Sequence, residues 1–371
     1  MRKTILRALR SLGVAGAAAL AAALALFAGP VMAHTHDVTA PTPYVQWVTG
    51  VHPQGDVFDA TGETFYLRHS SNPDPTGPCN YSGAGALPVQ RYPIQNPGTG
   101  TTGIPFGTQD ARWIGGRVIG EVSIVGDGSI MGYCNSAGIE FKSNISTAQV
   151  IERVRIDRVW DGIRVNMDPC KNAPGTCNQT VRGVWITNAR DDAVENDGMG
   201  GLLVEDSLLD GVFSGISATP GTCSTCPPSH RLTDTITLRD SLLRLRGFPY
   251  TSTGLGGYQP KYHVAPFKID ATLGPGIVIE NSVIAAEFYM SSVGYAHWAN
   301  FFAHVDSCTG SEFLWLSDTA FPPASFPPLP SWWATCFTVT TGTAAWESWN
   351  NARTQWIMEH PLVERMAWDP Q

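Results

Sequence analysis

The sequence predicts an all-β solenoid, a parallel β-helix in which short strands stack coil upon coil. Segments with the same residue pattern recur along the chain: an apolar strand, a polar pair that usually ends in Asp or Asn, then more apolar residues. They can be laid over one another at 154–163, 184–193, 203–212, 237–243 and 278–284. Apolar and polar residues alternate at period two within them, which is typical of strands rather than helices. Repeats that cannot bury their own apolar faces stack on their neighbours.

This overlay makes two predictions about the register of the stacked strands. Ile156, Ile186 and Val204 should align in neighbouring strands of one sheet. Asp and Asn side chains at a coil corner can hydrogen-bond turn backbone or one another. The residues expected at one such corner in successive coils are Asp206, Asp240 and Asn281.

The chain begins with a segment that is predicted to lie outside the fold. Residues 1–33 have the pattern of a signal peptide, because four basic residues precede an Ala/Leu-rich run that is broken at Gly29-Pro30 and followed by a cleavage pattern at Ala33. The run approaches membrane-spanning length, so an uncleaved anchor is the alternative. The Ala richness and the cleavage pattern favour export, and we expect no stable membrane association after cleavage.

Three further segments follow the leader. Residues 34–117 are rich in Pro and Gly and are predicted to form an N-terminal cap, and residues 118–290 should form the coil. Residues 291–371 should form a Trp-rich C-terminal cap, in which Thr343 to Glu359 is an amphipathic helix ended by Pro361. Caps are expected because an open coil exposes unpaired strand edges at its two ends.

The charge of the chain restricts its partners. It carries 24 basic and 32 acidic residues, so removing the four basic residues of the leader leaves 20 against 32, a net charge of −12. No basic patch remains that could neutralise a phosphate backbone, and we therefore expect no nucleic-acid partner. We expect a monomer.

The cysteines agree with an exported protein. All eight follow the leader, and an even number in an exported chain predicts disulfides. A redox or zinc role for the close pair Cys223 and Cys226 is disfavoured, because the sequence has no second close pair of matching spacing. The expected disulfides are Cys170–Cys177, Cys223–Cys226, Cys79–Cys134 and Cys308–Cys336.

Three acidic dipeptides, Asp161-Gly162, Asp191-Asp192 and Asp210-Gly211, take matched positions in the overlay. With them the region 118–284 resembles the right-handed parallel β-helix proteins of the pectin-lyase-like superfamily, which is rich in secreted polysaccharide lyases and hydrolases. Asp-Gly followed one coil later by Asp-Asp is similar to the polygalacturonase-like hydrolases. Two other marks of that family, a His flanked by glycines and a later Arg-x-Lys, are not found. The resemblance implies a right-handed coil and a polysaccharide substrate.

The acidic residues are the candidates for catalysis. Asp191, Asp192, Glu195 and Asp197 lie within seven residues, and Asp161 should stack beside them on the neighbouring coil, at about 4.8 Å. Two such carboxyls can hold different pKa values, as glycoside hydrolysis requires, with Asp192 as the general acid and Asp161 or Asp191 as the base. Alternatively the cluster binds Ca²⁺, with Glu195 and Asp197 among the ligands, or its members are turn residues bonded to backbone.

Three cations and two tyrosines are the candidates for substrate binding. Arg164, Arg190 and Lys268 would hold the substrate of a hydrolase, whereas in a lyase one of them would take the proton beside a uronate carboxylate. Their other reading is ion pairing with the acids. Tyr258 and Tyr262 flank a Gly-rich insertion, where aromatic rings either stack on sugars or pack under the loop.

These observations predict a secreted enzyme that cleaves a polysaccharide by glycosidic hydrolysis. One alternative is a calcium-dependent polysaccharide lyase, and otherwise no cofactor is expected. Another alternative is a non-catalytic β-helix that binds glycans or serves as a surface protein. The acidic cluster separates these classes, because a pure binding protein has no need for several carboxyls on adjacent coils.

Overall fold

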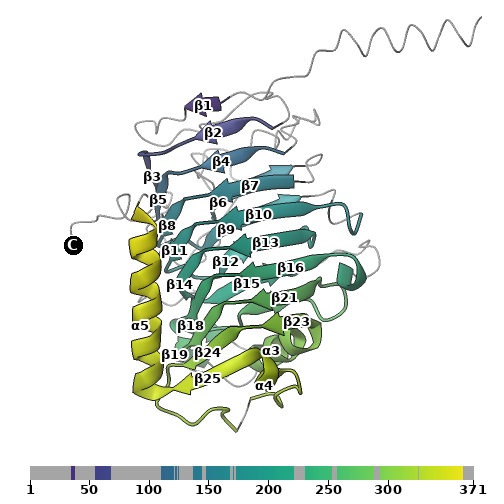
Figure 1. Cartoon of the computed structure of the whole chain (residues 1–371), viewed down its shortest axis with the longest axis vertical. Helices are drawn as coiled ribbons and strands as arrows, with labels where there is room; N and C mark the ends of the chain where they lie inside the picture. Colours follow the sequence, from purple (N-terminus) through teal and green to yellow (C-terminus); the bar gives the residue numbers. More distant parts are fainter. Residues whose placement is uncertain are drawn as a thin grey trace, which may run out of the picture.

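The computed structural model describes residues 35–37, 55–67, 110–120, 122, 124, 137–143, 148–167, 170, 173–220, 230–252, 257–287, 293–324 and 326–361. These residues form three sheets of parallel strands, which stack coil upon coil along the long axis of the molecule (Figure 1). The predicted leader lies outside them. No helix in the described part of the chain combines the length and apolarity needed to cross a membrane.

Two of the sheets contain nine described strands each. Sheet A contains, in spatial order, β1 (Thr35–Asp37), β2 (Val57–Asp59), β4 (Arg112–Ile114), β7 (Ala148–Glu152), β10 (Asn178–Arg182), β13 (Gly201–Glu205), β16 (Thr235–Arg239), β21 (Gly276–Glu280) and β23 (Val305–Thr309). Sheet B contains β3 (Thr64–Leu67), β5 (Arg117–Gly120), β8 (Arg155–Asp157), β11 (Trp185–Thr187), β14 (Leu208–Val212), β17 (Leu242–Leu245), β22 (Val283–Ala286), β24 (Ser311–Trp315) and β25 (Phe337–Thr341).

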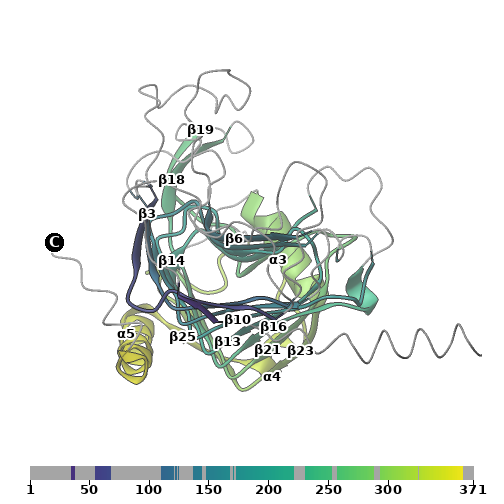
Figure 2. The ribbon, with the colours of Figure 1, turned by 90° about the horizontal axis from the view of Figure 1, so that it is seen from above.

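The third side of the coil is shorter. Sheet C contains β6 (Ala137–Ser143), β9 (Asp161–Met167), β12 (Asp192–Glu195), β15 (Ser214–Ala218) and β20 (Phe267–Ile269). A separate antiparallel hairpin, β18 (Phe248–Ser252) with β19 (Gly257–Tyr262), projects from the coil (Figure 2). The helices are the 3₁₀ turn η2 (His230–Leu232), α3 (Val293–His304), α4 (Trp333–Cys336) and α5 (Gly342–Glu359).

The core of the coil consists of columns of apolar side chains. In β10, Gln179 and Val181 are buried while Thr180 between them is partly exposed, so successive side chains alternate between interior and surface. The parallel register then stacks like on like in neighbouring coils. One interior column of sheet A is Ile151, Val181, Val204, Leu238 and Ile279.

The corner between sheets A and B confirms the predicted stack of turn residues. Asp206, Asp240 and Asn281 follow paired strands and have φ of 47°, 48° and 49°. Asp and Asn tolerate this left-handed conformation better than most residues. A serine follows each of them, and the serines hydrogen-bond from coil to coil; the Ser241 amide, for example, donates to Ser282 Oγ at 3.2 Å.

The predicted alignment of Val204 is wrong. Ile156 and Ile186 pair in sheet B as expected, but the next position in that column belongs to Leu209. Val204 lies in sheet A, where it pairs with Val181. Period-two alternation is the same on every sheet, so the overlay superposed a corner between sheets A and B on a corner between sheets B and C.

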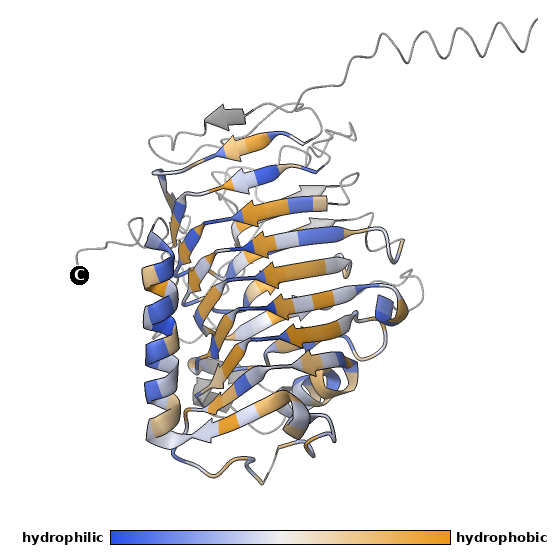
Figure 3. Cartoon of the chain, viewed as in Figure 1, coloured by the Kyte–Doolittle hydropathy of each residue, from blue (hydrophilic) through white to orange (hydrophobic). Residues whose placement is uncertain are grey.

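The helical C-terminal segment is confirmed, and α5 spans nearly the predicted residues. It lies along the outer face of sheet B rather than over the end of the coil (Figure 2). Trp349 and Trp356 are buried there, and the Trp356 ring meets Trp185 of β11 edge-on at 6.2 Å. The side of α5 seen in Figure 3 is largely hydrophilic, whereas apolar residues recur along the stacked strands.

Aromatic rings close the C-terminal end of the coil. Trp298 of α3 is fully buried and lies 4.8 Å from Phe326, and Trp333 of α4 lies 5.0 Å from Phe313, measured between ring centroids. The parallel sheets also extend beyond the expected limits of the coil, since β2 and β4 precede residue 118 and β23 to β25 follow residue 290.

Two of the expected disulfides are confirmed. Cys170 is bonded to Cys177 and Cys308 to Cys336. The first closes a loop between β9 and β10, and the second ties β23 to α4. The other two expected pairs, Cys79–Cys134 and Cys223–Cys226, lie outside the described residues.

Candidate active site

The outer face of sheet C carries most of the predicted site. Ile163, Val194 and Ile216 pair in register and point into the core. The residue after each of them therefore faces outward, and these residues form a column that continues to β20. In spatial order the column is Arg164, Glu195, Ser217 and Lys268.

An extra residue in the coil of β11 and β12 changes how the aspartates match. Thr187 pairs with Asp157, yet Val194 pairs with Ile163, so this coil has one more residue between these points than its neighbour. Comparison with the next coil, that of β14 and β15, shows the same excess of one residue in the coil of β11 and β12. This comparison places the extra residue before Asp192. Asp192, not Asp191 as the overlay had it, therefore stacks on Asp161.

The stacked pair is joined directly. The Asp192 amide donates a hydrogen bond to Asp161 Oδ1 at 3.2 Å. Both side chains are buried, with exposed fractions of 0% for Asp161 and 2% for Asp192. The inserted residue, Asp191, leaves 28% of its side chain exposed. Asp191 is thus the most accessible of the three predicted catalytic residues.

Two cations hold the carboxyl groups in place. The guanidinium of Arg164 contacts Asp161 and also Glu195, where Nε lies 2.6 Å from Oε2. The Lys268 ammonium lies 2.9 Å from Asp191 Oδ1 and 2.8 Å from Asp192 Oδ2. Lys268 therefore bridges the accessible carboxylate and the buried one.

The cluster has more acids than cations. Among the residues that the structure describes, the cations in contact with the five carboxyl groups of Asp161, Asp191, Asp192, Glu195 and Asp197 are Arg164 and Lys268. Each buried acid therefore gains from holding a proton, because burial disfavours the ionised form and a neighbouring negative charge disfavours it further.

The pKa values of the buried acids follow from this imbalance. Burial, followed by the charge of Asp191, raises the pKa of Asp192 to about 7. Burial and a hydrogen bond with Asp197 raise the pKa of Glu195 to about 8, against the opposing charge of Arg164. The pKa of Asp161 is raised well above its ordinary value by burial and by the charge of Glu195.

The charged form of Lys268, unlike that of the buried acids, is stabilised by its neighbours. Burial alone would lower the pKa of its ammonium, but the charges of Asp191 and Asp192 overcome that effect and hold the pKa well above its ordinary value. Lys268 therefore remains a cation across the physiological pH range.

Some predicted residues lie elsewhere. The Arg190 side chain is buried, donates to the Pro249 carbonyl oxygen at 2.9 Å and lies over the Phe248 ring, so it supports the β18–β19 hairpin. Asp210 faces outward from sheet B and is held by Arg244 and Arg353. Tyr258 and Tyr262 lie on β19, and their side chains are outside the described part of the structure.

Helix α3 carries His297, one of three late histidines that on sequence grounds could face the same groove as the acids, with nothing to fix their place. The helix follows β22 and packs on β20, with Trp298 Nε1 donating to the Val264 carbonyl oxygen at 3.0 Å. Burial, followed by the charge of the Lys268 ammonium, lowers the pKa of the His297 imidazole to about 4. Several histidines are scattered along the sequence, and no spacing distinguishes His297 from the others.

The cluster partly fits a calcium ion. One oxygen from each of Asp161, Asp192 and Glu195 lies within 4.8 Å of the others, and hard carboxylate oxygens suit Ca²⁺. Asp192 Oδ1 is buried and has no hydrogen-bond partner. Arg164 and Lys268, however, already contact the same carboxyls. Of the two predicted metal ligands, Glu195 belongs to this triad, and Asp197 instead shares a hydrogen bond with Glu195.

Comparison with known proteins adds no relative. A scan against models of protein families, a search of curated proteins and a search of solved structures each gave no match.

Proposed function

We propose that this chain is a secreted polysaccharide-degrading enzyme of the pectin-lyase-like superfamily, and that it cleaves glycosidic bonds by hydrolysis at the outer face of sheet C. The observation that carries the proposal is a pair of adjacent carboxyls bridged by one lysine. Asp192 is buried and has a pKa of about 7, whereas Asp191 is partly exposed. The two environments suit an acid and a base.

Asp192 is the general acid. A carboxyl with a pKa near 7 still carries a proton at neutral pH, and proton transfer is most efficient when the pKa lies near the working pH. The leaving oxygen of the glycosidic bond would take that proton. Asp161, stacked behind Asp192, accepts its amide hydrogen bond and fixes the strand.

Asp191 is the base that activates water. Its carboxylate is oriented by Lys268 and is the more exposed member of the pair. Asp161 was an equal candidate on sequence grounds, but full burial and a raised pKa make it a poor base. Arg164 holds Asp161 and Glu195, and therefore positions the site rather than the substrate.

Elimination is the less favoured reaction. A lyase needs a neutral basic residue to remove the proton beside a uronate carboxylate. Lys268 is the cation nearest the accessible carboxylate, and its raised pKa keeps it protonated. A calcium-dependent lyase is the second candidate, supported by the carboxylate triad and by the unpartnered oxygen of Asp192.

The test is incubation of the secreted protein with a panel of polysaccharides, with and without a chelator, following reducing ends and the absorbance of unsaturated products. We expect reducing ends without unsaturated product, and insensitivity to the chelator. Asp192→Asn should abolish turnover, whereas Asp318→Asn, at an exposed site on another part of the chain, should not.

Two outcomes would replace the proposal. Unsaturated products that disappear with chelator would identify the calcium-dependent lyase. No cleavage of any polysaccharide would favour the non-catalytic glycan-binding protein. Export is tested separately, by N-terminal sequencing of the secreted protein, which should begin near His34.

A further inference from the structure

A second concave site lies on the outer face of sheet A, away from the carboxyl cluster on sheet C. It is a groove with a volume of about 360 Å³ that crosses β10, β13 and β16. The side chains that the argument uses are Asn178, Thr180, Leu203, Thr235 and Thr237.

A glycine lies in the middle of the groove. Gly201 of β13 pairs with Asn178 on one side and lies one residue before the pair of Leu202 with Ile236 on the other. A Cβ atom at Gly201 would lie 2.6 Å from the Cys177 carbonyl oxygen, so no larger residue fits without movement of backbone. Gly201 therefore lets β13 lie close against the coil of Cys177, and no side chain projects from this point of the groove.

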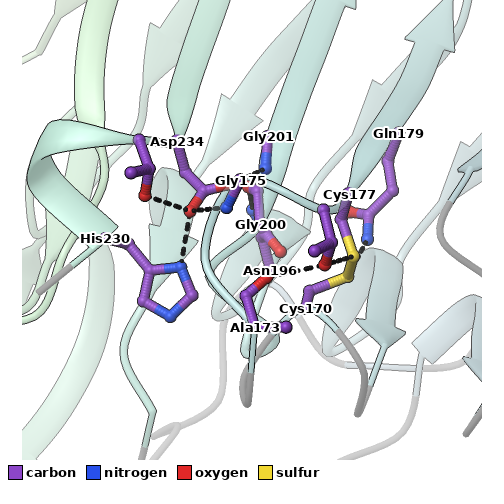
Figure 4. Close-up of a disulfide and its surroundings, with 12 residues drawn as sticks. Cys170, Ala173, Gly175, Cys177, Gln179, Asn196, Gly200, Gly201, His230 and Asp234 are labelled. Atoms are coloured by element: carbon purple, nitrogen blue, oxygen red, sulfur yellow. Dashed lines mark hydrogen bonds and ion pairs between the residues drawn. A yellow bond between two sulfur atoms is a disulfide. The ribbon is translucent and has the colours of Figure 1, made fainter. Parts of the chain in front are cut away.

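One wall of the groove is fixed by a buried aspartate (Figure 4). Asp234 Oδ2 accepts a hydrogen bond from the Gly175 amide at 2.9 Å and lies 2.8 Å from Nδ1 of the buried His230. Asp234 Oδ1 accepts from the Gly201 amide at 3.2 Å. A single carboxylate therefore joins the loop before β10, the start of β13 and the turn η2.

A disulfide fixes the other side. Cys170 and Cys177 close the loop that carries Gly175, and Gln179 Nε2 lies 3.4 Å from Cys170 Sγ beneath it (Figure 4). The groove is thus held in shape before any ligand binds, which lowers the entropy cost of binding.

The polar groups of the groove are free to bind a ligand. In the described part of the chain, the side chains of Asn178, Thr180, Thr235 and Thr237 make no hydrogen bond with the protein. Asp234 is the one charged residue among the described residues that line the groove, and its oxygens are already bonded. Leu203 lies between Thr180 and Thr237 in register and offers an apolar contact.

The chemistry of this lining selects its ligand. Among its described lining residues the groove offers an anionic chain no cation, and a peptide could not add as a strand because β10, β13 and β16 are paired on both sides. Hydroxyl and amide groups lie on β10 and on β16, two coils or about 9.6 Å apart, and suit a ligand that presents hydroxyl groups on both sides of an apolar surface. The apolar side chain between them suits the carbon face of a sugar ring.

We propose that this groove is an auxiliary binding site for a neutral polysaccharide chain. It holds the polymer on sheet A, while the carboxyl cluster on sheet C acts on it. The choice of a glycan as ligand rests on the proposed function, and the neutral character rests on the lining itself.

The test is affinity electrophoresis of the inactive Asp192→Asn protein in gels that contain xyloglucan, galactan or mixed-linkage β-glucan, with polygalacturonate as the anionic comparison. At least one neutral polymer should retard the protein. Thr180→Ala combined with Thr237→Ala should weaken that binding about tenfold, as expected for two lost hydrogen bonds. The matched control, Thr338→Ala with Thr340→Ala on β25, should leave it unchanged.

Both groove threonines are at the surface, so the double variant should keep the circular dichroism spectrum and melting temperature of its parent. Equal retardation of parent and double variant would overturn the proposal, as would retardation by polygalacturonate alone or by none of the polymers. Because binding is read in an inactive background, these outcomes do not depend on whether the wild type hydrolyses any of the polymers.

Discussion

Two columns of outward-facing side chains, one on sheet A and one on sheet C, arrange their charged groups in opposite ways. On sheet A the signs alternate from coil to coil. Arg182 lies 2.7 Å from Glu152, and Arg239 lies 2.7 Å from Glu280 and 3.3 Å from Glu205. We call this column of alternating charges the ladder, and its arginines are well exposed. Each charge therefore has an opposite neighbour, and all members except the buried Glu152 remain in contact with water.

On sheet C the carboxyls outnumber the cations, and those of Asp161, Asp192 and Glu195 are buried. Stacking places Asp192 on Asp161 and Glu195 beside them, with Arg164 and Lys268 as the cations in contact. Like charges in adjacent coils cost free energy, and the ladder on sheet A shows that this scaffold can avoid the cost by alternation. A cluster that keeps the imbalance holds protons near neutral pH, which is what an acid–base site needs.

The largest effect that separates the two columns is on stability. Arg164→Met removes the cation that joins two buried carboxyls and should lower the free energy of unfolding by about 3 kcal/mol or more, as for a broken buried ion pair. Arg182→Met on sheet A should cost less than about 1 kcal/mol, because Arg182 is exposed and Arg112 still pairs with Glu152. Urea denaturation of both variants measures the difference, and equal losses would remove the distinction between the columns.

The next effect is on activity. Asp192→Asn should reduce kcat by at least about a hundredfold, because the general acid is lost. Its melting temperature should not fall, since the amide needs no proton to be neutral in a buried position. Steady-state kinetics and a melting curve on the same preparation check both parts. A fully active Asp192→Asn protein would exclude the proposed site.

A third difference is in the pH dependence of stability. The folded-state pKa values of Asp192 and Glu195, about 7 and 8, are raised above their unfolded values. Their contribution to stability is therefore complete below the unfolded values of 3.8 and 4.5 and is lost progressively as the pH rises from there through about 7 to 8. The lowered pKa of His297 acts only below its unfolded value of 6.5. The melting temperature should fall between about pH 6.5 and 8.5, and a profile that stays flat or rises there would contradict this account.

In the matched variant Asp192→Asn with Glu195→Gln, the fall above about pH 6.5 should be much smaller, because neither group titrates. Differential scanning calorimetry over a series of buffers measures the two slopes. The same steep fall in the double variant would assign the pH dependence to groups outside the cluster.

The smallest effect belongs to the ladder on sheet A. Glu205→Gln should change Tm by less than about 2 °C, because Arg239 keeps its closer partner Glu280 and exposed ion pairs contribute little. Activity should be unchanged. A large loss of stability in this variant would show that the alternating column is more than a means of avoiding repulsion.

Period-two patterning was enough to predict the parallel coil and the corner of Asp206, Asp240 and Asn281. It could not say to which of three sheets a segment belongs, since Val204 and Ile186 have the same local pattern but lie in different sheets. It also missed the single inserted residue that moves Asp192, rather than Asp191, onto Asp161. One residue shifts every side chain to the other face of a strand, so this error changes the roles of the two aspartates.

Other features depend on contacts between distant parts of the chain. Asp210 occupies a position in the overlay that matches the other aspartates, but it lies on sheet B. There it forms an ion pair with Arg353 of α5, whose Nε lies 2.7 Å from Oδ2. His297 enters the site because α3 packs on β20. No local spacing encodes either contact, whereas the cluster of Asp191, Asp192, Glu195 and Asp197 was visible because its members are close in sequence.

The most direct test of the proposed chemistry is to carry out the cleavage in ¹⁸O-labelled water and to weigh the products by mass spectrometry. Hydrolysis with Asp191 activating water and Asp192 protonating the leaving group predicts one ¹⁸O atom at each new reducing end. Products without the label, lighter by one water and unsaturated, would show elimination and contradict the assignment of the carboxyl cluster as a hydrolytic site.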